Sequence, residues 1–286
     1  MLQVKEFFDK QTSTLTYVVW DEQSRDAAAI DPVLDYDSAT SKTKETSVLE
    51  VVSFIREKKL NLHFILETHA HADHLSAAQA MKREFKTARI GIGARIKEVQ
   101  STFKPIFDMP AGFKTDGSQF DALFEDRQKV RAGSLEFEVI FTPGHTPACA
   151  SYFFGRELIF TGDALFMPDY GTGRCDFPGA SAETLYESIH EKLYSLADEV
   201  KGYTGHDYQP GGRELRFMAT IGEQKVSNVH LKTETPKNDF VKFRTERDST
   251  LNAPKLLLPS IQVNIDAGRL PSANSHGDRF LKIPIS

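Results

Sequence analysis

The heptapeptide THAHADH, residues 68–74, contains three of the nine histidines of this 286-residue chain. It follows directly after LHFIL (62–66), a short apolar run typical of a buried strand. Residues i and i+2 of an extended loop point to the same side, so His69 and His71 can face one cavity. Imidazole and carboxylate groups together suit Zn, Fe or Mn. The heptapeptide therefore predicts a metal site at the end of a strand.

Three further motifs also place metal-ligand residues at the ends of predicted strands. His145 lies in PGHT after the alternating run LEFEVIFT (135–142), and Asp163 lies in TGD at the end of ELIFTGD. His206 follows a short strand-like run that ends at Gly205. A rigid sheet positions the loops at its strand ends for chemistry. We therefore expect the four motifs to form one metal centre.

The remaining pattern is mixed α and β. Apolar alternation or short apolar runs predict strands at residues 16–20, 27–30, 62–66, 135–142, 150–154, 157–161 and 202–205. Periodic apolar residues predict helices over 48–55, 76–85 and 181–197, the first preceded by a capping box at Ser47. Beyond Pro210 we expect charged helices and a Pro-rich tail that covers the core.

Composition excludes several classes of protein. Hydrophobic residues make up 40% and charged residues 26% of the chain, as in ordinary globular domains. The net charge of −5 gives no attraction to nucleic acid or anionic membranes. No apolar run approaches the ~18 residues of a membrane span, and the N-terminal residues lack the apolar region of a signal peptide. Two cysteines, Cys149 and Cys175, predict no disulfide framework and favour a cytoplasmic protein.

The motifs HAHADH, PGHT, TGD and GH stand in the order found in the metallo-β-lactamase superfamily, which the chain resembles over roughly residues 10–210. The resemblance implies an α+β fold, a four-layer αββα sandwich with a short C-terminal extension. We expect residues 1–210 to form the catalytic domain. Residues 211–286 would supply helices and a tail packed on the same domain.

Local segments favour one branch of that superfamily. GDALF (162–166), GRCDF (173–177), GHDY (205–208) and the tail LPSIQVNIDAG (258–268) resemble persulfide dioxygenases. HTPAC (145–149) is similar to the HTPGC of those enzymes, with Ala148 in place of Gly. Glyoxalase II enzymes more often have GDTLF and GRFFEG. The resemblance therefore favours an iron-dependent dioxygenase that oxidises glutathione persulfide with O₂ to sulfite and glutathione.

The resemblance implies one Fe(II) per chain, held by His69, His145 and Asp163. Two histidines and one carboxylate leave open positions for substrate and O₂. The remaining motif residues would form hydrogen bonds around the centre or hold a second metal: His71, Asp73, His74 and His206.

Two alternatives remain open. A hydroxyacylglutathione hydrolase of the glyoxalase II type would hold two Zn ions, with all seven motif residues as ligands and Asp163 as the bridge. A second alternative is a non-enzymatic persulfide or metal sensor. Nucleic acid and membranes are not expected as partners. The resemblance leaves a homodimer possible, since relatives commonly dimerise, but the sequence does not give the oligomeric state.

Candidate substrate-binding residues outside the metal ligands follow from the charges and hydrogen-bond donors that a glutathione-linked substrate needs. Arg174 is expected to bind a substrate carboxylate, because a guanidinium does so in a bidentate way. Tyr170 and Arg216 are further candidates, whereas Arg213 is interpreted as a surface charge. Tyr208 is expected to donate a hydrogen bond near the iron.

The other reactive or charged residues are assigned structural roles. Cys149 is expected to be a small buried apolar side chain rather than a nucleophile. Lys97, Lys104 and the run KFRTER (242–247) are interpreted as solvated helix faces.

Overall fold

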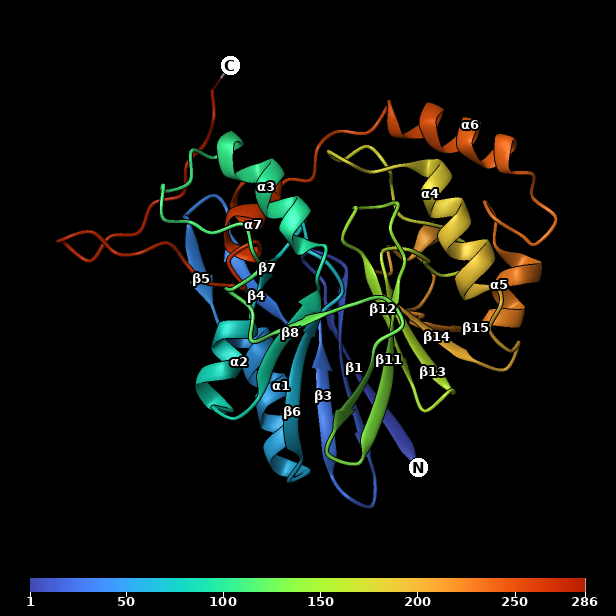
Figure 1. Cartoon of the computed structure of the whole chain (residues 1–286), viewed down its shortest axis with the longest axis horizontal. Helices are drawn as coiled ribbons and strands as arrows, with labels where there is room; N and C mark the ends of the chain where they lie inside the picture. The colour runs from blue at the N-terminus through green and yellow to red at the C-terminus, as the bar shows by residue number, and fades with distance from the viewer. Residues whose placement is uncertain (286) are drawn as a thin grey trace.

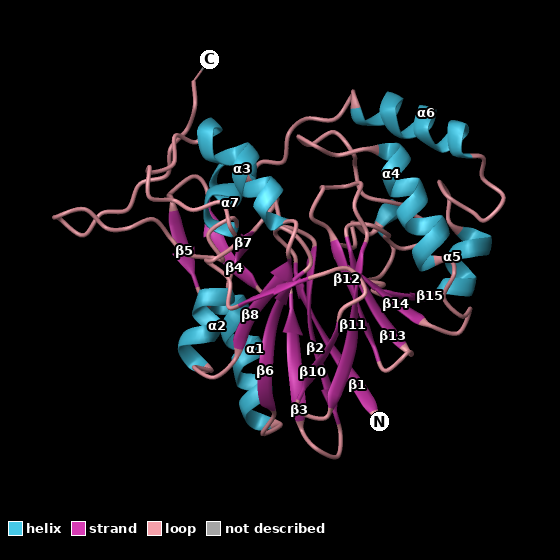
Figure 2. Ribbon diagram, in the orientation of Figure 1, coloured by secondary structure: helices cyan, strands magenta, loops and turns pink. Residues whose placement is uncertain are grey.

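The computed structural model describes residues 1–285, and two six-stranded β-sheets packed face to face form its centre (Figure 1). Figure 2 shows helices on the outer side of both sheets. This is the four-layer αββα sandwich expected from the resemblance. Residue 286, the last of the expected C-terminal segment, lies outside the described residues.

The first sheet has the order β1-β2-β3-β6-β8-β9. Its strands are β1 (Leu2–Asp9), β2 (Thr14–Asp21), β3 (Asp26–Ile30), β6 (Asn61–Glu67), β8 (Arg89–Gly93) and β9 (Ala122–Phe124). The strands from β3 to β9 are parallel, so their carboxyl ends meet at one edge of the sheet.

The second sheet follows in chain order, β10-β11-β12-β13-β14-β15. Its strands are β10 (Lys129–Ala132), β11 (Leu135–Phe141), β12 (Ala150–Phe154), β13 (Leu158–Gly162), β14 (Lys201–Thr204) and β15 (Met218–Thr220). The pairs are antiparallel except for β13 with β14. The parallel pair brings the loops after Gly162 and Thr204 to the same edge.

Helices cover the outer faces of the sheets. The first sheet carries α1 (Thr46–Glu57), α2 (Ala78–Glu84), α3 (Ile96–Ile106) and α7 (Leu257–Asn264). The second carries α4 (Ala182–Glu187), its π-helical continuation (Ser188–Leu193), α5 (Ile221–Ser227) and α6 (Lys237–Asp248). A small third sheet pairs β5 (Lys42–Lys44), β4 (Val33–Asp37) and β7 (Leu75–Ser76). A 3₁₀ turn occupies Pro210–Gly212.

The layer between the sheets is rich in aromatic side chains, and two tyrosines connect the sheets through it. The hydroxyl of Tyr152 on β12 donates to the carbonyl of Glu67 at the end of β6, 2.7 Å away. The hydroxyl of Tyr17 on β2 donates to the carbonyl of Thr204 at the end of β14, also at 2.7 Å. A buried tyrosine hydroxyl needs such a partner. Both bonds fix strand ends that precede predicted ligands.

The sequence patterns located most central elements. All seven predicted strands are present, each within about two residues of its expected ends. The helix predicted over 76–85 begins at Ala78, because Ser76 belongs to β7 and its hydroxyl accepts from the Ala78 amide. The helix predicted over 181–197 has Ser181 as its N-cap and becomes π-helical before ending at Leu193.

The capping box at Ser47 was predicted wrongly. Ser47 lies inside α1, and the carboxylate of Asp35 on β4 accepts both its amide at 3.0 Å and its hydroxyl at 2.5 Å. The first turn of α1 is therefore capped by a residue from a neighbouring strand.

Within residues 1–285, no helix is both long and apolar enough to traverse a bilayer.

Because Asp35 satisfies the first turn of α1, Asp35→Ala should lower the free energy of unfolding by about 1 kcal/mol. Urea denaturation followed by circular dichroism measures the change. Glu50→Ala, at an exposed position of the same helix, is the control and should stay within about 0.5 kcal/mol of the wild type. Equal stability of the two variants would contradict a capping role for Asp35.

Candidate metal centre

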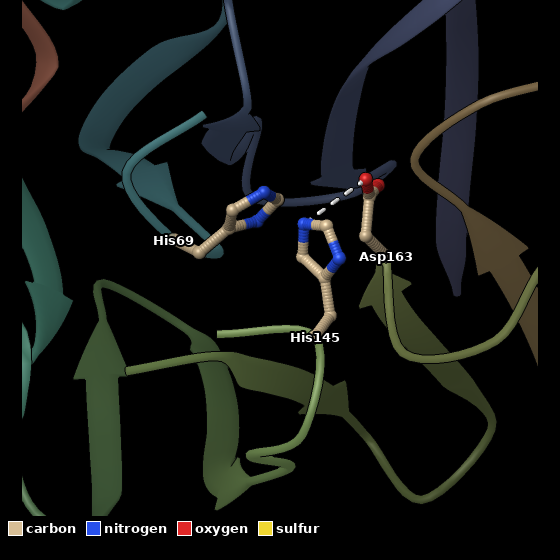
Figure 3. Close-up of side chains that lie close together, drawn as sticks. All are labelled: His69, His145 and Asp163. Atoms are coloured by element: carbon tan, nitrogen blue, oxygen red, sulfur yellow. Dashed lines mark ion pairs between the residues drawn. The ribbon is translucent and has the colours of Figure 1, made fainter. Parts of the chain in front are cut away.

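The four ligand-bearing loops meet at one edge of the two sheets. His69 follows β6 of the first sheet, while His145, Asp163 and His206 follow β11, β13 and β14 of the second. Figure 3 shows His69, His145 and Asp163 converging on one point from separate loops. A ligand atom from each of these three residues lies within 4.8 Å of the other two.

The hydrogen bonds around His69 leave its Nε2 available to a metal. The ring is 1% exposed, and its Nδ1 lies 3.0 Å from the Thr68 hydroxyl. That hydroxyl donates to Asp31, so it can accept from Nδ1–H. Nε2 then carries the lone pair, and it has no hydrogen-bond partner among residues 1–285. Burial lowers the pKa of His69 well below its usual value, which keeps the ring neutral.

His145 is oriented in the same way. Its Nδ1 donates to the backbone carbonyl of Arg174 at 2.7 Å, which turns Nε2 towards Asp163. Nε2 lies 3.6 Å from Oδ2 of Asp163, the pair marked in Figure 3. Burial lowers the pKa of His145 as well. Both histidines therefore present a neutral Nε2, the form that ligates metals.

Asp163 connects this triad to a second group of ligands. Its other oxygen, Oδ1, lies 3.4 Å from Nε2 of His206, which is also 3.4 Å from Oδ2 of Asp73. Ligand atoms of His71, Asp73 and His206 lie within 4.8 Å of one another. In the described part of the chain, His74 belongs to neither group, and its Nδ1 lies 3.2 Å from Asp73.

The ring of His71 lies beside two buried carboxylates. Its Nε2 lies 3.0 Å from Asp31 and 3.6 Å from Glu67, while Nδ1 has no partner among the described residues. Burial opposes a charge on the ring, but the two carboxylates outweigh it and raise the pKa of His71 well above its usual value. Burial also raises the pKa of Glu67.

The residues at this site fit a metal ion. Several buried polar atoms remain without a partner in residues 1–285 and cluster here: His69 Nε2, His71 Nδ1, His74 Nε2 and Asp163 Oδ1. A buried polar atom without a partner is costly, and ions bound within the two groups would satisfy His69 Nε2, His71 Nδ1 and Asp163 Oδ1, with His74 Nε2 outside both groups. Two imidazoles and a carboxylate with open positions suit Fe(II) or Zn(II).

A pocket of about 590 Å³ opens over the triad, with Asp73, His145 and Asp163 in its lining. Tyr170 and Tyr208 form part of its wall, with their ring centres 4.8 Å apart, and the Tyr208 ring stacks on His206 at 5.5 Å. Tyr208 is 42% exposed as a residue, but desolvation around its hydroxyl, together with nearby carboxylates, raises its pKa well above its usual value. Its hydroxyl therefore remains a hydrogen-bond donor.

The arginines named from the sequence are already paired. Arg174 lines the pocket, but its guanidinium donates to both carboxylate oxygens of Asp176 at 2.6 and 2.5 Å. Arg213 is held between Asp169 and Asp207. Arg216 pairs with Glu223 and lies outside the pocket lining.

The interpretation of KFRTER (242–247) as a solvated face was wrong for two of its residues. Arg244 is 2% exposed and donates to both oxygens of Asp248, one helical turn away. Arg247 lines the pocket with Lys255, and neither has an ion-pair partner in residues 1–285. A charge every few residues on a helix was the only sequence signal for them, and it does not reveal which charges face a pocket.

Cys149 is buried, and its sulfur accepts from the Thr146 amide at 3.3 Å. Burial raises the pKa of its thiol to about 12, which fits a packed side chain rather than a nucleophile. Cys175 is also a free thiol, and burial raises its pKa too.

Comparison with known proteins gives matches that agree on the superfamily and differ in the activities that they name. Residues 11–212 match the sequence model of the metallo-β-lactamase superfamily. A protein named glyoxylase B2 from Dictyostelium discoideum is 46% identical over 284 residues, covering 99% of this chain and 97% of that protein. The human mitochondrial persulfide dioxygenase is 30% identical over 253 residues, 88% of this chain and 82% of that protein. The crystal structure of ETHE1 from Myxococcus xanthus superposes with a TM-score of 0.74 at 29% identity, covering 93% of this chain and all of that one.

The position of Asp163 between both ligand groups predicts the outcome of two substitutions. Asp163→Ala should abolish metal binding, because it removes the only carboxylate of the triad. Asp73→Ala should leave most of the metal in place, because Asp73 lies in the other group. Metal content of protein loaded anaerobically with Fe(II) and then desalted measures both. Equal losses would contradict a single-metal centre at His69, His145 and Asp163.

Proposed function

The chain belongs to the metallo-β-lactamase superfamily, and we propose that within it the protein is an iron-dependent dioxygenase that oxidises glutathione persulfide. The observation that carries this proposal is the triad of His69, His145 and Asp163 beneath an open pocket. Two histidines and one carboxylate are typical of non-haem Fe(II) oxygenases. The similarity to a human persulfide dioxygenase supports the same assignment.

The proposed reaction balances in atoms and electrons. Glutathione persulfide, O₂ and water give glutathione, sulfite and two protons. The terminal sulfur loses four electrons and O₂ gains them, while the sulfur–sulfur bond breaks and the thiol sulfur of glutathione takes up a proton. Bound iron would supply the electron transfer between the sulfur and O₂.

The side chains of this protein would bind and orient the substrate. Thr68 and the Arg174 carbonyl fix the two imidazoles, so the triad keeps its geometry when the pocket is filled. Tyr208 holds a proton on its hydroxyl beside the centre and can donate it in a hydrogen bond to the anionic sulfur. Phe166 and Phe177 line the pocket and exclude water from the reacting sulfur.

The cations in the pocket suit the two carboxylates of the glutathione moiety. Arg174 and Arg244 are each neutralised by a neighbouring aspartate, at 2.5 Å in both pairs. Arg247 and Lys255 have no carboxylate partner among residues 1–285. They line the side of the pocket formed by α6 and the loop after it. We therefore assign substrate carboxylate binding to Arg247 and Lys255 ahead of Arg174. The two free thiols fit a reducing compartment such as the cytoplasm.

Thioester hydrolysis at two zinc ions is the second candidate. The group of His71, Asp73 and His206 beside the triad favours it, as does the similarity to a protein named glyoxylase B2. The position of His74 counts against it. The two-metal assignment needs His74 as a ligand with Asp73 and His206, whereas the ring lies outside that group among residues 1–285.

Oxygen uptake by anaerobically purified, iron-loaded protein separates the two candidates. With glutathione persulfide we expect O₂ consumption and sulfite formation in equal amounts, with about one iron per chain. Acyl-glutathione hydrolysis by zinc-loaded protein is assayed in parallel. Hydrolysis without oxygen uptake, with two zinc ions per chain, would refute the dioxygenase assignment.

Arg247→Ala should raise the KM for glutathione persulfide by about ten-fold, because a charge-assisted hydrogen bond to a carboxylate is lost. The kcat should change little, since Arg247 belongs to neither group of metal ligands. Lys242→Ala on the same helix is the matched control, because Lys242 is exposed and outside the pocket lining. Steady-state kinetics of both variants measure the effect. A fall in kcat at unchanged KM would contradict a binding role for Arg247.

A further inference from the structure

Helix α7 ends directly against the loop that carries the histidines. Its last residue, Asn264, is 4% exposed and lies among the buried apolar side chains of Ile261, Val263 and Ile265. A buried carboxamide is expensive unless all its donors and acceptors are used. The contacts of Asn264 therefore show what this end of the helix does.

All three hydrogen bonds of the Asn264 side chain go to the histidine loop. Nδ2 donates to the backbone carbonyls of His71 and His74, each at 2.8 Å. Oδ1 accepts from the backbone amide of Ser76, also at 2.8 Å. One side chain thus joins the backbone groups at both ends of the turn that contains Asp73.

The chain after α7 is shaped for this contact. The Gly268 amide bonds to the carbonyl of Val263, and Gly268 has a φ of +77°. A Cβ on Gly268 would lie 3.0 Å from the Ser76 carbonyl oxygen, so the two segments approach closely there. The Ala267 carbonyl also accepts from the Gln79 side chain at 2.9 Å. The end of α7 is thereby fixed against both sides of β7.

The loop has few other means of holding its shape. β7 is only two residues long, and the turn before it carries side chains that must stay turned inward with their ligand atoms unpaired. Buried backbone carbonyls need donors, and here they come from a residue about 190 positions away in the sequence. Loss of these donors would allow the turn to rotate its carbonyls and, with them, its side chains.

We propose that Asn264 is a positioning residue of the metal centre: its carboxamide holds the turn from His71 to Ser76 so that the histidine loop presents its ligands. This inference rests on the metal centre alone. In a single-metal centre it acts through His69, two residues before the turn, and in a two-metal centre it also acts on His71 and Asp73, which lie in the turn.

The test compares two carboxamides of the same helix. Gln262 is also buried and also makes three hydrogen bonds, but to Leu258 and to the backbone of Lys282 in the C-terminal tail. Asn264→Leu and Gln262→Leu each replace a buried carboxamide by an apolar side chain of similar size. The full chain is titrated with Co(II) against a competing chelator, and its visible spectrum and thermal midpoint are recorded.

We expect Asn264→Leu to weaken Co(II) binding by about ten- to a hundred-fold and to change the spectrum, with Gln262→Leu within about two-fold of the wild type. Both substitutions should lower the thermal midpoint. Wild-type affinity and spectrum in Asn264→Leu would overturn the proposal, as would equal losses of affinity in the two variants. If Asn264→Leu does not fold, Asn264→Ala replaces it, because it removes the two donors and adds neither bulk nor charge. The same outcomes then apply, and they do not depend on any turnover assay.

Discussion

The centre depends on the hydrogen bonds that join the two sheets at one edge. The Ala150 amide of the second sheet donates to the Thr68 carbonyl at 2.9 Å, directly before His69. The Leu15 amide on β2 of the first sheet donates to the Gly205 carbonyl at 2.9 Å, directly before His206. Strands of two separate sheets could slide against each other on apolar packing alone, because hydrophobic contact is not directional. These bonds fix the register, and four loops distant in sequence meet within a few ångströms.

Burial imposes a second constraint, because it decides which nitrogen of each imidazole faces the metal. Rings removed from water must place each N–H on an oxygen. Thr68 and the Arg174 carbonyl take Nδ1 of His69 and His145, so both present Nε2. Nε2 of His71 lies 3.0 Å from the carboxylate of Asp31, which leaves Nδ1 as the nitrogen that can face a metal. The histidine loop thus combines two orientations, and its oxygen partners are as much a part of the centre as the ligands.

The sequence predicts the parts of this centre that local pattern encodes. The strand ends and the ligands after them were identified because short apolar runs and histidine spacing are visible within ten residues. Contacts between segments that are distant in the sequence could not be identified in this way. Asp35 caps α1 across the interface between strand and helix, and Arg244 is buried only because the loop containing Thr172 packs on α6. Asn264 lies in a segment recognised by resemblance alone, and nothing around it in sequence indicates that it reaches the histidine loop.

The metal ligands and the cations proposed to bind the substrate lie in different parts of the chain. The metal ligands all lie within residues 11–212, the part that matches the superfamily. Arg247 and Lys255, which provide the unpaired positive charge of the pocket, lie beyond it, as do Arg244 and Asn264. A shared set of ligands can serve a hydrolase or a dioxygenase, so the ligands alone do not select the substrate. The C-terminal segment adds the charges that would bind the substrate and also fixes the loop that would bind the metal. Substrate binding and metal geometry would therefore both depend on the C-terminal segment, the first through α6 and the loop after it and the second through α7.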